Sequence, residues 1–245
     1  MTRLVRGGKA AYGQDVGILM MDNTFARLPG DIGNAMTFEF PVQFRVIDGS
    51  TNERIVWERD RALLAPYVGA AQELERSGVR AITTSCGFLA MFQPELAASV
   101  HVPLFTSSLL LVPLVKRMIR PDQRVGIITA DSSALDETHF NACGWSATEI
   151  PVALEGMQAR SAFWDAYPKN ALEYDVDAVA ADMRDAAVAL LREHPDVGAI
   201  VLECTNMAPY AHVVQEATGL PVFDVQTLTN LVYEATHRVP YGDGR

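Results

Sequence analysis

The chain has little basic charge and no long apolar run. Its 245 residues include 20 lysines and arginines against 30 acidic residues, with a net charge of -10. Binding to a phosphate backbone needs a basic surface, so we expect no nucleic acid partner. The first apolar run, residues 16–21, is far too short to span a bilayer and follows a polar, glycine-containing start. We therefore expect a cytoplasmic protein without a membrane partner.

Cysteine is scarce as well. Three cysteines are an odd and sparse set for this length, which argues against a disulfide framework. The chain contains no CxxC pair and no HExxH segment, so its spacing predicts no metal site. It is instead 49% hydrophobic with only 20% charged residues. That composition is typical of a well-packed globular protein with one large domain or two small ones.

Short apolar runs alternate with segments of helical periodicity along the chain. We expect buried strands at residues 16–19, 81–83, 102–105, 125–128, 199–202 and 221–223. Helices are expected at 61–76, 134–140, 176–193 and 207–218. This alternation predicts an α/β fold with mostly parallel sheets. The stretches outside it are a loop at 22–34, an additional strand or hairpin at 37–47 and an excursion or lid at 153–170.

The two halves of the chain match each other as an internal repeat. Cys86 pairs with Cys204 and Pro103 with Pro221 without a gap, since 204 minus 86 and 221 minus 103 both give 118. A second match sets the Val-Gly-Ile strand and the aspartate after it, residues 16–22, on residues 125–131. Duplication explains a cysteine and a proline in register better than chance does. We predict two pseudo-symmetric lobes around a cleft, residues 1–105 plus 225–245 and residues 106–224.

Cys86 and Cys204 each follow a predicted strand and precede a predicted helix. Ligands bind at this edge of open α/β sheets, and a helix start favours a thiolate and lowers a cysteine pKa. Facing each other across a cleft, one thiol would remove a proton from a bound molecule and the other would deliver one to the opposite face. We therefore predict that Cys86 and Cys204 are catalytic, whereas Cys143 has no repeat partner and is expected to be a core or surface thiol.

Polar residues near the same sheet edges are the candidate substrate-binding groups. Helix capping is an open alternative for several of them, because Ser, Thr and Asn are good caps and the same helix start also presents N–H groups to an anion. The candidates are Asn23, Ser85, Gly87, Thr106, Ser107, Thr205 and Asn206.

The segments Thr84-Ser85-Cys86 and Glu203-Cys204-Thr205-Asn206 resemble the aspartate/glutamate racemase superfamily over essentially the whole chain. The superfamily includes hydantoin racemases, maleate isomerases and arylmalonate decarboxylases. The resemblance implies two pseudo-symmetric α/β lobes with a cofactor-independent active site between them. Glutamate racemases have Asn and Thr after the first cysteine, where this chain has Gly87 and Phe88, and His where it has Asn206. The resemblance therefore does not imply glutamate as substrate.

The leading hypothesis is a racemase or epimerase that inverts a carbon next to a carboxylate or carbonyl by two-thiol proton transfer, without cofactor or metal. One alternative is a maleate-type cis-trans isomerase with a covalent cysteine nucleophile. Another is a non-enzymatic, two-lobed small-molecule-binding or thiol-sensing protein. The expected partner is a small carboxylic acid with an apolar or neutral side chain, because few basic residues lie near the cysteines. A homodimer is the base-rate expectation for assembly.

Overall fold

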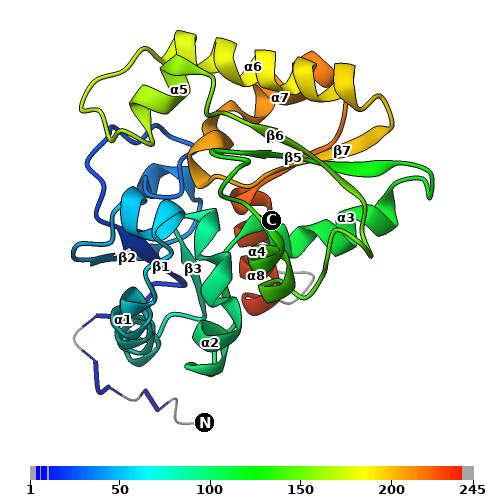
Figure 1. Cartoon of the computed structure of the whole chain (residues 1–245). Helices are drawn as coiled ribbons and strands as arrows, with labels where there is room; N and C mark the ends of the chain where they lie inside the picture. The colour runs from blue at the N-terminus through cyan, green and yellow to red at the C-terminus, as the bar shows by residue number, and fades with distance from the viewer. Residues whose placement is uncertain (1–3, 6, 10, 239–245) are drawn as a thin grey trace.

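The computed structural model describes residues 4–5, 7–9 and 11–238, and its core is a pair of parallel four-stranded sheets (Figure 1). The first sheet has the order β2-β1-β3-β4, from β1 (Val16–Met21), β2 (Val42–Ile47), β3 (Ala81–Thr84) and β4 (Leu104–Phe105). The second has the order β6-β5-β7-β8, from β5 (Arg124–Thr129), β6 (Val152–Gly156), β7 (Val197–Leu202) and β8 (Val222–Phe223). The predicted α/β class with two parallel sheets is confirmed. The predicted first lobe also includes residues 1–3, 6, 10 and 239–245, which lie outside the described residues.

Each sheet repeats the other strand for strand. The central strands β1 and β5 both contain a glycine that lies under a helix. A Cβ atom on Gly17 would come 2.8 Å from Leu74 Cδ1, and one on Gly126 would come 2.7 Å from Leu190 Cδ2. The repeated Val-Gly-Ile strand therefore has the same packing role in both sheets, because only glycine allows the covering helix to lie this close.

Of two strands at sheet edges, β2 lies within the strand or hairpin expected at 37–47, whereas β6 lies largely within the excursion expected at 153–170. β2 pairs in parallel with β1, and β6 pairs in parallel with β5, so the predicted excursion at 153–170 contains the end of a sheet strand and a short helix. Both strands are at sheet edges and are only partly buried. Edge strands of this kind lack the continuous apolar run that identifies buried parallel strands. That is why residues 153–170 do not show a strand pattern.

Helices cover the two sheets. Around the first sheet lie α1 (Leu64–Ser77) and α2 (Gln93–Ala98), and α5 (Ser161–Ala166), α6 (Val176–Glu193) and α7 (Ala211–Thr218) lie over the second (Figure 1). The bounds of α6 agree with the sequence prediction, and Asp175 caps its start by accepting hydrogen bonds from two backbone N–H groups. Within the described part of the chain, no helix combines the length and apolar character needed to cross a bilayer.

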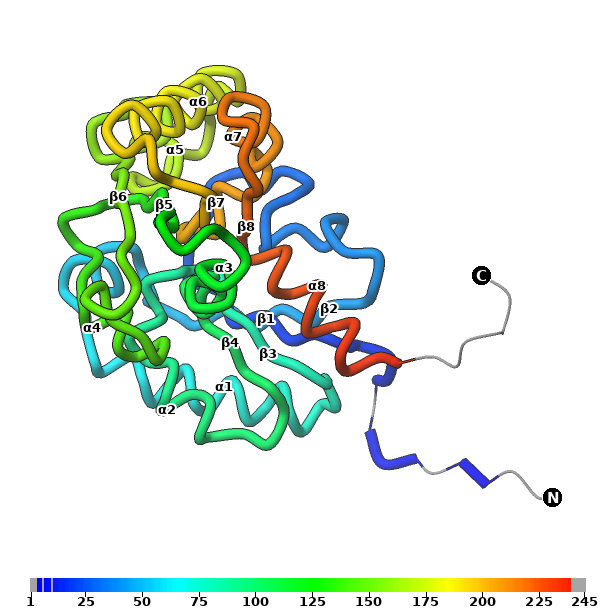
Figure 2. The backbone as a smooth tube through the Cα atoms, turned by 90° about the vertical axis from the view of Figure 1, so that its right-hand side faces the viewer, coloured from blue at the N-terminus to red at the C-terminus, as the bar shows by residue number. Residues whose placement is uncertain are grey.

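Two crossing helices and α4 (Glu137–Ala142) complete the fold. α3 (Val112–Met118) packs beside β5, and α8 (Val225–Thr236) runs from β8 back to β3 (Figure 2). The Arg80 guanidinium fixes the end of α8 by donating to the backbone oxygen of Thr236 at 3.0 Å. Each crossing helix thus follows the last strand of one sheet and contacts the other sheet. The lobe boundaries at residues 105 and 225 stay a prediction.

Candidate active site

A pocket lies where the carboxyl ends of the central strands of both sheets meet. Met21 from the end of β1 and Ala130 from the end of β5 line it, together with residues that follow β3 and β7. This is the edge at which open α/β sheets bind ligands. The predicted site residues found in the lining are Asn23, Ser85, Cys86, Gly87, Cys204 and Asn206.

Three other predicted residues lie outside this lining, and their hydroxyl groups have partners within the protein. Thr106 Oγ1 donates to Gln93 Oε1 at 2.8 Å, and Ser107 Oγ caps a 3-10 helix by accepting from Leu109 N. Thr205 Oγ1 donates to the backbone oxygen of Ser85 at 2.7 Å, which joins the two cysteine segments. Substrate binding by Thr106, Ser107 and Thr205 stays a prediction.

Both pocket cysteines are N-caps of 3-10 helices, Cys86 of Gly87–Phe92 and Cys204 of Thr205–Tyr210. Burial raises the pKa of Cys86 to about 12, and the Glu203 carboxylate adds to the shift, whereas hydrogen bonds from backbone N–H groups of the helix start lower it. Burial, followed by Glu203, also raises the pKa of Cys204 well above its ordinary value. The helix starts act in the predicted direction, but desolvation outweighs them. The expected lowering of the thiol pKa is therefore wrong, because burial and the Glu203 carboxylate raise the pKa of both thiols.

Glu203 is a fully buried carboxyl group beside the first cysteine segment. Its Oε2 accepts a hydrogen bond from Thr129 Oγ1 at 2.8 Å, and its Oε1 has no hydrogen-bond partner among the described residues. A Cβ atom on Gly87 would lie 2.1 Å from Glu203 Oε1 and 2.3 Å from its backbone oxygen. Glycine is thus required after Cys86, because the glutamate of the other segment occupies the space of a side chain. Burial raises the pKa of Glu203 to about 7.

The raised pKa of Glu203 predicts a pH-dependent loss of stability. Between its ordinary pKa of 4.5 and about 7, the unfolded chain releases this proton while the folded protein retains it. The free energy of unfolding therefore falls as the pH rises through this window, by about 3 kcal/mol in total. Glu203→Gln removes the ionisation, so we expect it to be more stable than the wild type at pH 8 and similar at pH 5. Urea unfolding from pH 5 to 8 measures the difference, and parallel profiles would contradict the prediction.

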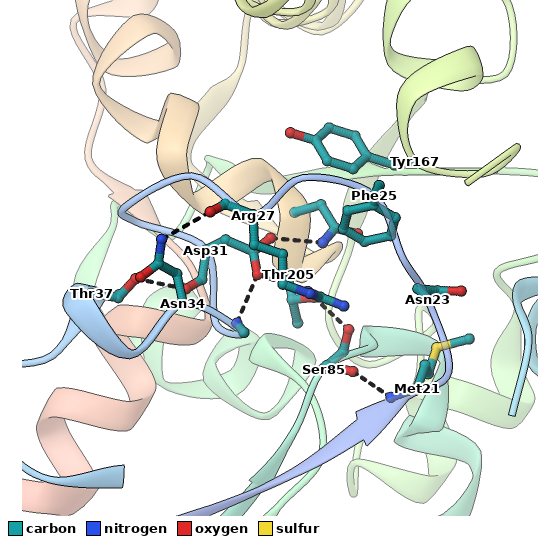
Figure 3. A network of polar contacts seen from close by, with 12 residues as sticks. Met21, Asn23, Phe25, Arg27, Asp31, Asn34, Thr37, Ser85, Tyr167 and Thr205 are labelled. Carbon is teal, nitrogen blue, oxygen red and sulfur yellow. Dashed lines mark hydrogen bonds and ion pairs between the residues drawn. The ribbon is translucent and has the colours of Figure 1, made fainter. Parts of the chain in front are cut away.

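A network of polar contacts connects Cys204 to the loop after β1, and Figure 3 shows the part of it around Arg27 and Asp31. The Cys204 thiol donates to Asn206 Oδ1 at 3.5 Å, and Asn206 Nδ2 donates to Asp31 Oδ2 at 2.8 Å. Asp31 is 1% exposed and pairs with Arg27 at 2.7 Å, and it also accepts from Gly33 N. The loop at 22–34 therefore positions the side chain of Asn206 beside the second thiol.

The opposite wall of the pocket contains residues that the sequence did not single out. Trp57 ends the π-helical turn Glu53–Trp57, Asp131 follows β5, and Trp164 lies on α5. Trp57 Nε1 donates to Asp131 Oδ2 at 2.9 Å, and the ring centroids of Trp57 and Trp164 are 5.8 Å apart. The signal for Asp131 was its match to Asp22 in the internal repeat. Trp164 lies within the excursion predicted at 153–170, whereas Trp57 lies between the predicted segments 37–47 and 61–76 and had no signal of its own.

Comparisons with known proteins identify relatives over most of the chain. A family model described as Asp/Glu/Hydantoin racemase matches residues 47–229. A dimethylsulfoniopropionate lyase of Durusdinium sp. clade D is 32% identical over 214 residues, which cover 85% of this chain and 70% of that protein. Dimethylsulfoniopropionate lyase 3 of Emiliania huxleyi is 28% identical over 223 residues, covering 88% of this chain and 58% of that protein. This chain therefore matches little more than half of the second relative's length.

Solved structures show the same fold. Unliganded arylmalonate decarboxylase superposes with a TM-score of 0.58 at 15% sequence identity, over 95% of this chain and 97% of that one. Since the identity is low, the likeness establishes the two-sheet architecture and nothing about the reaction.

Proposed function

The chain belongs to the Asp/Glu/Hydantoin racemase family, and from that premise we propose that it is a cofactor-independent enzyme acting on a carbon next to a carboxylate. In this proposal the thiolate of Cys86 or Cys204 removes a proton from that carbon. The observation that carries the proposal is that both thiols line one pocket at the carboxyl ends of the two sheets. A protein that binds a small molecule without reacting with it does not need two thiols in the binding pocket.

The surroundings of the thiols support a reaction that passes through negative charge. Backbone N–H groups of Phe88 and Leu89 face the Cys86 thiol, and that of Asn206 faces Cys204. These dipoles are fixed before the reaction starts, so they stabilise a thiolate or a developing carbanion without reorganisation. The substrate carboxylate is proposed to lie between the two helix starts, where the amide of Asn23 also reaches the pocket.

We propose β-elimination from a β-sulfonio carboxylate such as dimethylsulfoniopropionate as the reaction. The thiolate takes the proton from the carbon next to the carboxylate, and the C–H electron pair forms the C=C bond. The bond between the β-carbon and sulfur breaks, and its electron pair leaves with sulfur as neutral dimethyl sulfide, giving acrylate. The proton on the thiol then passes to solvent. The named lyase at 32% identity supports this reaction, and the pocket supports it through its aromatic wall.

Racemisation or epimerisation of a chiral carboxylic acid is the second candidate function. It shares the first step, but the carbanion is protonated from the opposite face instead of expelling a leaving group. The observation that favours it is the pseudo-symmetry of the two thiols, since each follows the equivalent strand of its own sheet, β3 or β7. A two-base racemase uses one thiol for each hand of its substrate.

Product formation distinguishes the two candidates. The wild-type protein with dimethylsulfoniopropionate is expected to release dimethyl sulfide and acrylate in equal amounts, measured by gas chromatography and by liquid chromatography. The folded double variant Cys86→Ser/Cys204→Ser is the control and should release neither. A panel of chiral carboxylic acids in deuterated water tests the second candidate through deuterium at the carbon next to the carboxylate. Deuterium exchange without release of dimethyl sulfide would favour racemisation over elimination. The absence of both dimethyl sulfide and deuterium exchange would reject the proposed function.

A further inference from the structure

The polar character of the pocket is unusual for a site that accepts a carboxylic acid. Among the described residues of its lining there is no lysine, arginine or histidine, and Asp131 is the single carboxylate. Asp131 is 6% exposed, and within the described part of the chain the donors that reach its carboxylate are neutral: Trp57 Nε1, the backbone and hydroxyl of Ser133, and the backbone of Ala134. A buried negative charge without a cationic partner is costly, so a positively charged group in the pocket would stabilise it.

The tryptophans offer aromatic surface next to this carboxylate. Trp57 is 42% exposed although it is a large apolar residue, and Trp164 is partly buried beside it. Their ring planes are inclined by 53°, so the rings form two adjoining walls rather than a stack. The cation–π contacts among the described residues involve Phe25 and Phe92, so no arginine or lysine covers either tryptophan.

We infer that Trp57, Trp164 and Asp131 form a binding site for an onium head group, either a tertiary sulfonium or a quaternary ammonium. Such a cation has no N–H group to donate, so it is recognised through aromatic faces and through charge rather than hydrogen bonds. Trp57 comes from a turn after β2, and Asp131 and Trp164 come from the second sheet and its helix. The site rests on the proposed function, since it supplies the cationic end of the proposed substrate.

The same site explains how a thiol of high pKa can act as a base. Burial, followed by the Glu203 carboxylate, raises the pKa of both thiols. An onium ion within the low-dielectric pocket favours the thiolate by Coulomb attraction, which lowers the thiol pKa. Hydrogen bonds from Ser133 and Trp57 overcome the effect of burial and lower the pKa of Asp131, so its charge is present at neutral pH. A cationic substrate would therefore promote the formation of its own base.

The experiment compares two ligands of one shape and different charge. 3-(Trimethylammonio)propanoate carries the onium charge, and 4,4-dimethylpentanoate has carbon in place of nitrogen. Isothermal titration calorimetry with the wild type is expected to show about tenfold tighter binding of the cationic ligand. Trp57→Leu, Trp164→Leu and Asp131→Asn should each reduce this preference, and Trp57→Phe should keep part of it because an aromatic face remains. Val56→Ala, at an apolar position of the same lining, is the matched control and should lower the affinity for both ligands by the same factor.

Binding separates this inference from the proposed function, because neither ligand needs to react. Equal affinities of the wild type for both ligands would overturn the onium site. Tryptophan variants that lower the affinity for both ligands by the same factor would overturn it too. The rings would then contribute apolar contact to both ligands and no attraction for the positive charge. A cation preference that the variants abolish, together with no release of dimethyl sulfide, would retain the onium site and reject the lyase activity.

Discussion

Serine in place of the cysteine that acts as base is expected to lower the rate of elimination by about a hundred- to ten-thousand-fold, because serine is a far weaker base than a thiolate. Elimination needs one proton acceptor, and dimethyl sulfide leaves as a neutral molecule without protonation. Cys86→Ser and Cys204→Ser should therefore show unequal losses, with the smaller loss about tenfold or less. Initial rates of sulfide release measure the difference.

Racemisation would give a different pattern, since each thiol then serves one hand of the substrate and both single variants should lose activity to a similar degree. Cys143→Ser is the matched control, because Cys143 is a buried thiol outside the pocket lining. It should retain wild-type kcat even where its stability changes. Near-normal rates for both pocket variants would show that neither thiol is the base, and each would then be an ordinary packed residue.

Much of the fold could be predicted from the sequence, because buried strands give continuous apolar runs and duplication gives matching residues at a constant offset. The apolar runs at β1, β3, β5 and β7 are buried on both faces and are therefore continuous. The repeated glycines of β1 and β5 reflect close packing of a helix on the sheet in both halves. The edge strand β6 gave no such apolar run, since only Ala153 of its five residues is buried and the other four are partly exposed.

The site was predicted in part for a different reason. Cys86 and Cys204 follow strand ends, and the topology of parallel sheets brings all such positions to one edge. Trp57 and Trp164 enter the pocket from a π-helical turn and from a helix after an edge strand, and neither position follows from periodicity. Their proximity depends on how the two sheets are placed relative to each other, which no local pattern encodes.

The direction of the cysteine pKa shift also could not be predicted from the sequence. The helix start after each thiol is a local feature, and its effect has the predicted direction. Desolvation and the charge of Glu203 depend on the surrounding structure, and they dominate. Glu203 directly precedes Cys204 in the chain, yet its carboxylate is also among the causes that raise the pKa of Cys86 in the other segment.

Asp31→Ala is expected to have the largest effect on stability. The Asp31 carboxylate pairs with Arg27 and accepts from Gly33 N and Asn206 Nδ2, and it is almost fully buried. Removing it leaves the guanidinium of Arg27 buried without its partner, although one of its nitrogens already lacks a hydrogen bond in the described structure. Breaking a buried ion pair from one side costs about 3–5 kcal/mol. Urea unfolding at neutral pH measures this loss.

The double variant Asp31→Ala/Arg27→Met tests whether the loss comes from the stranded charge. Methionine keeps most of the apolar stem of arginine but removes its charge, so the double variant should be more stable than Asp31→Ala alone. Turnover should not recover with stability, because Asn206 would still lack the acceptor that orients it beside Cys204. A double variant that recovers both stability and turnover would show that Asp31 only neutralises Arg27. A loss below about 1 kcal/mol for Asp31→Ala would show instead that the pair contributes no more than an exposed one.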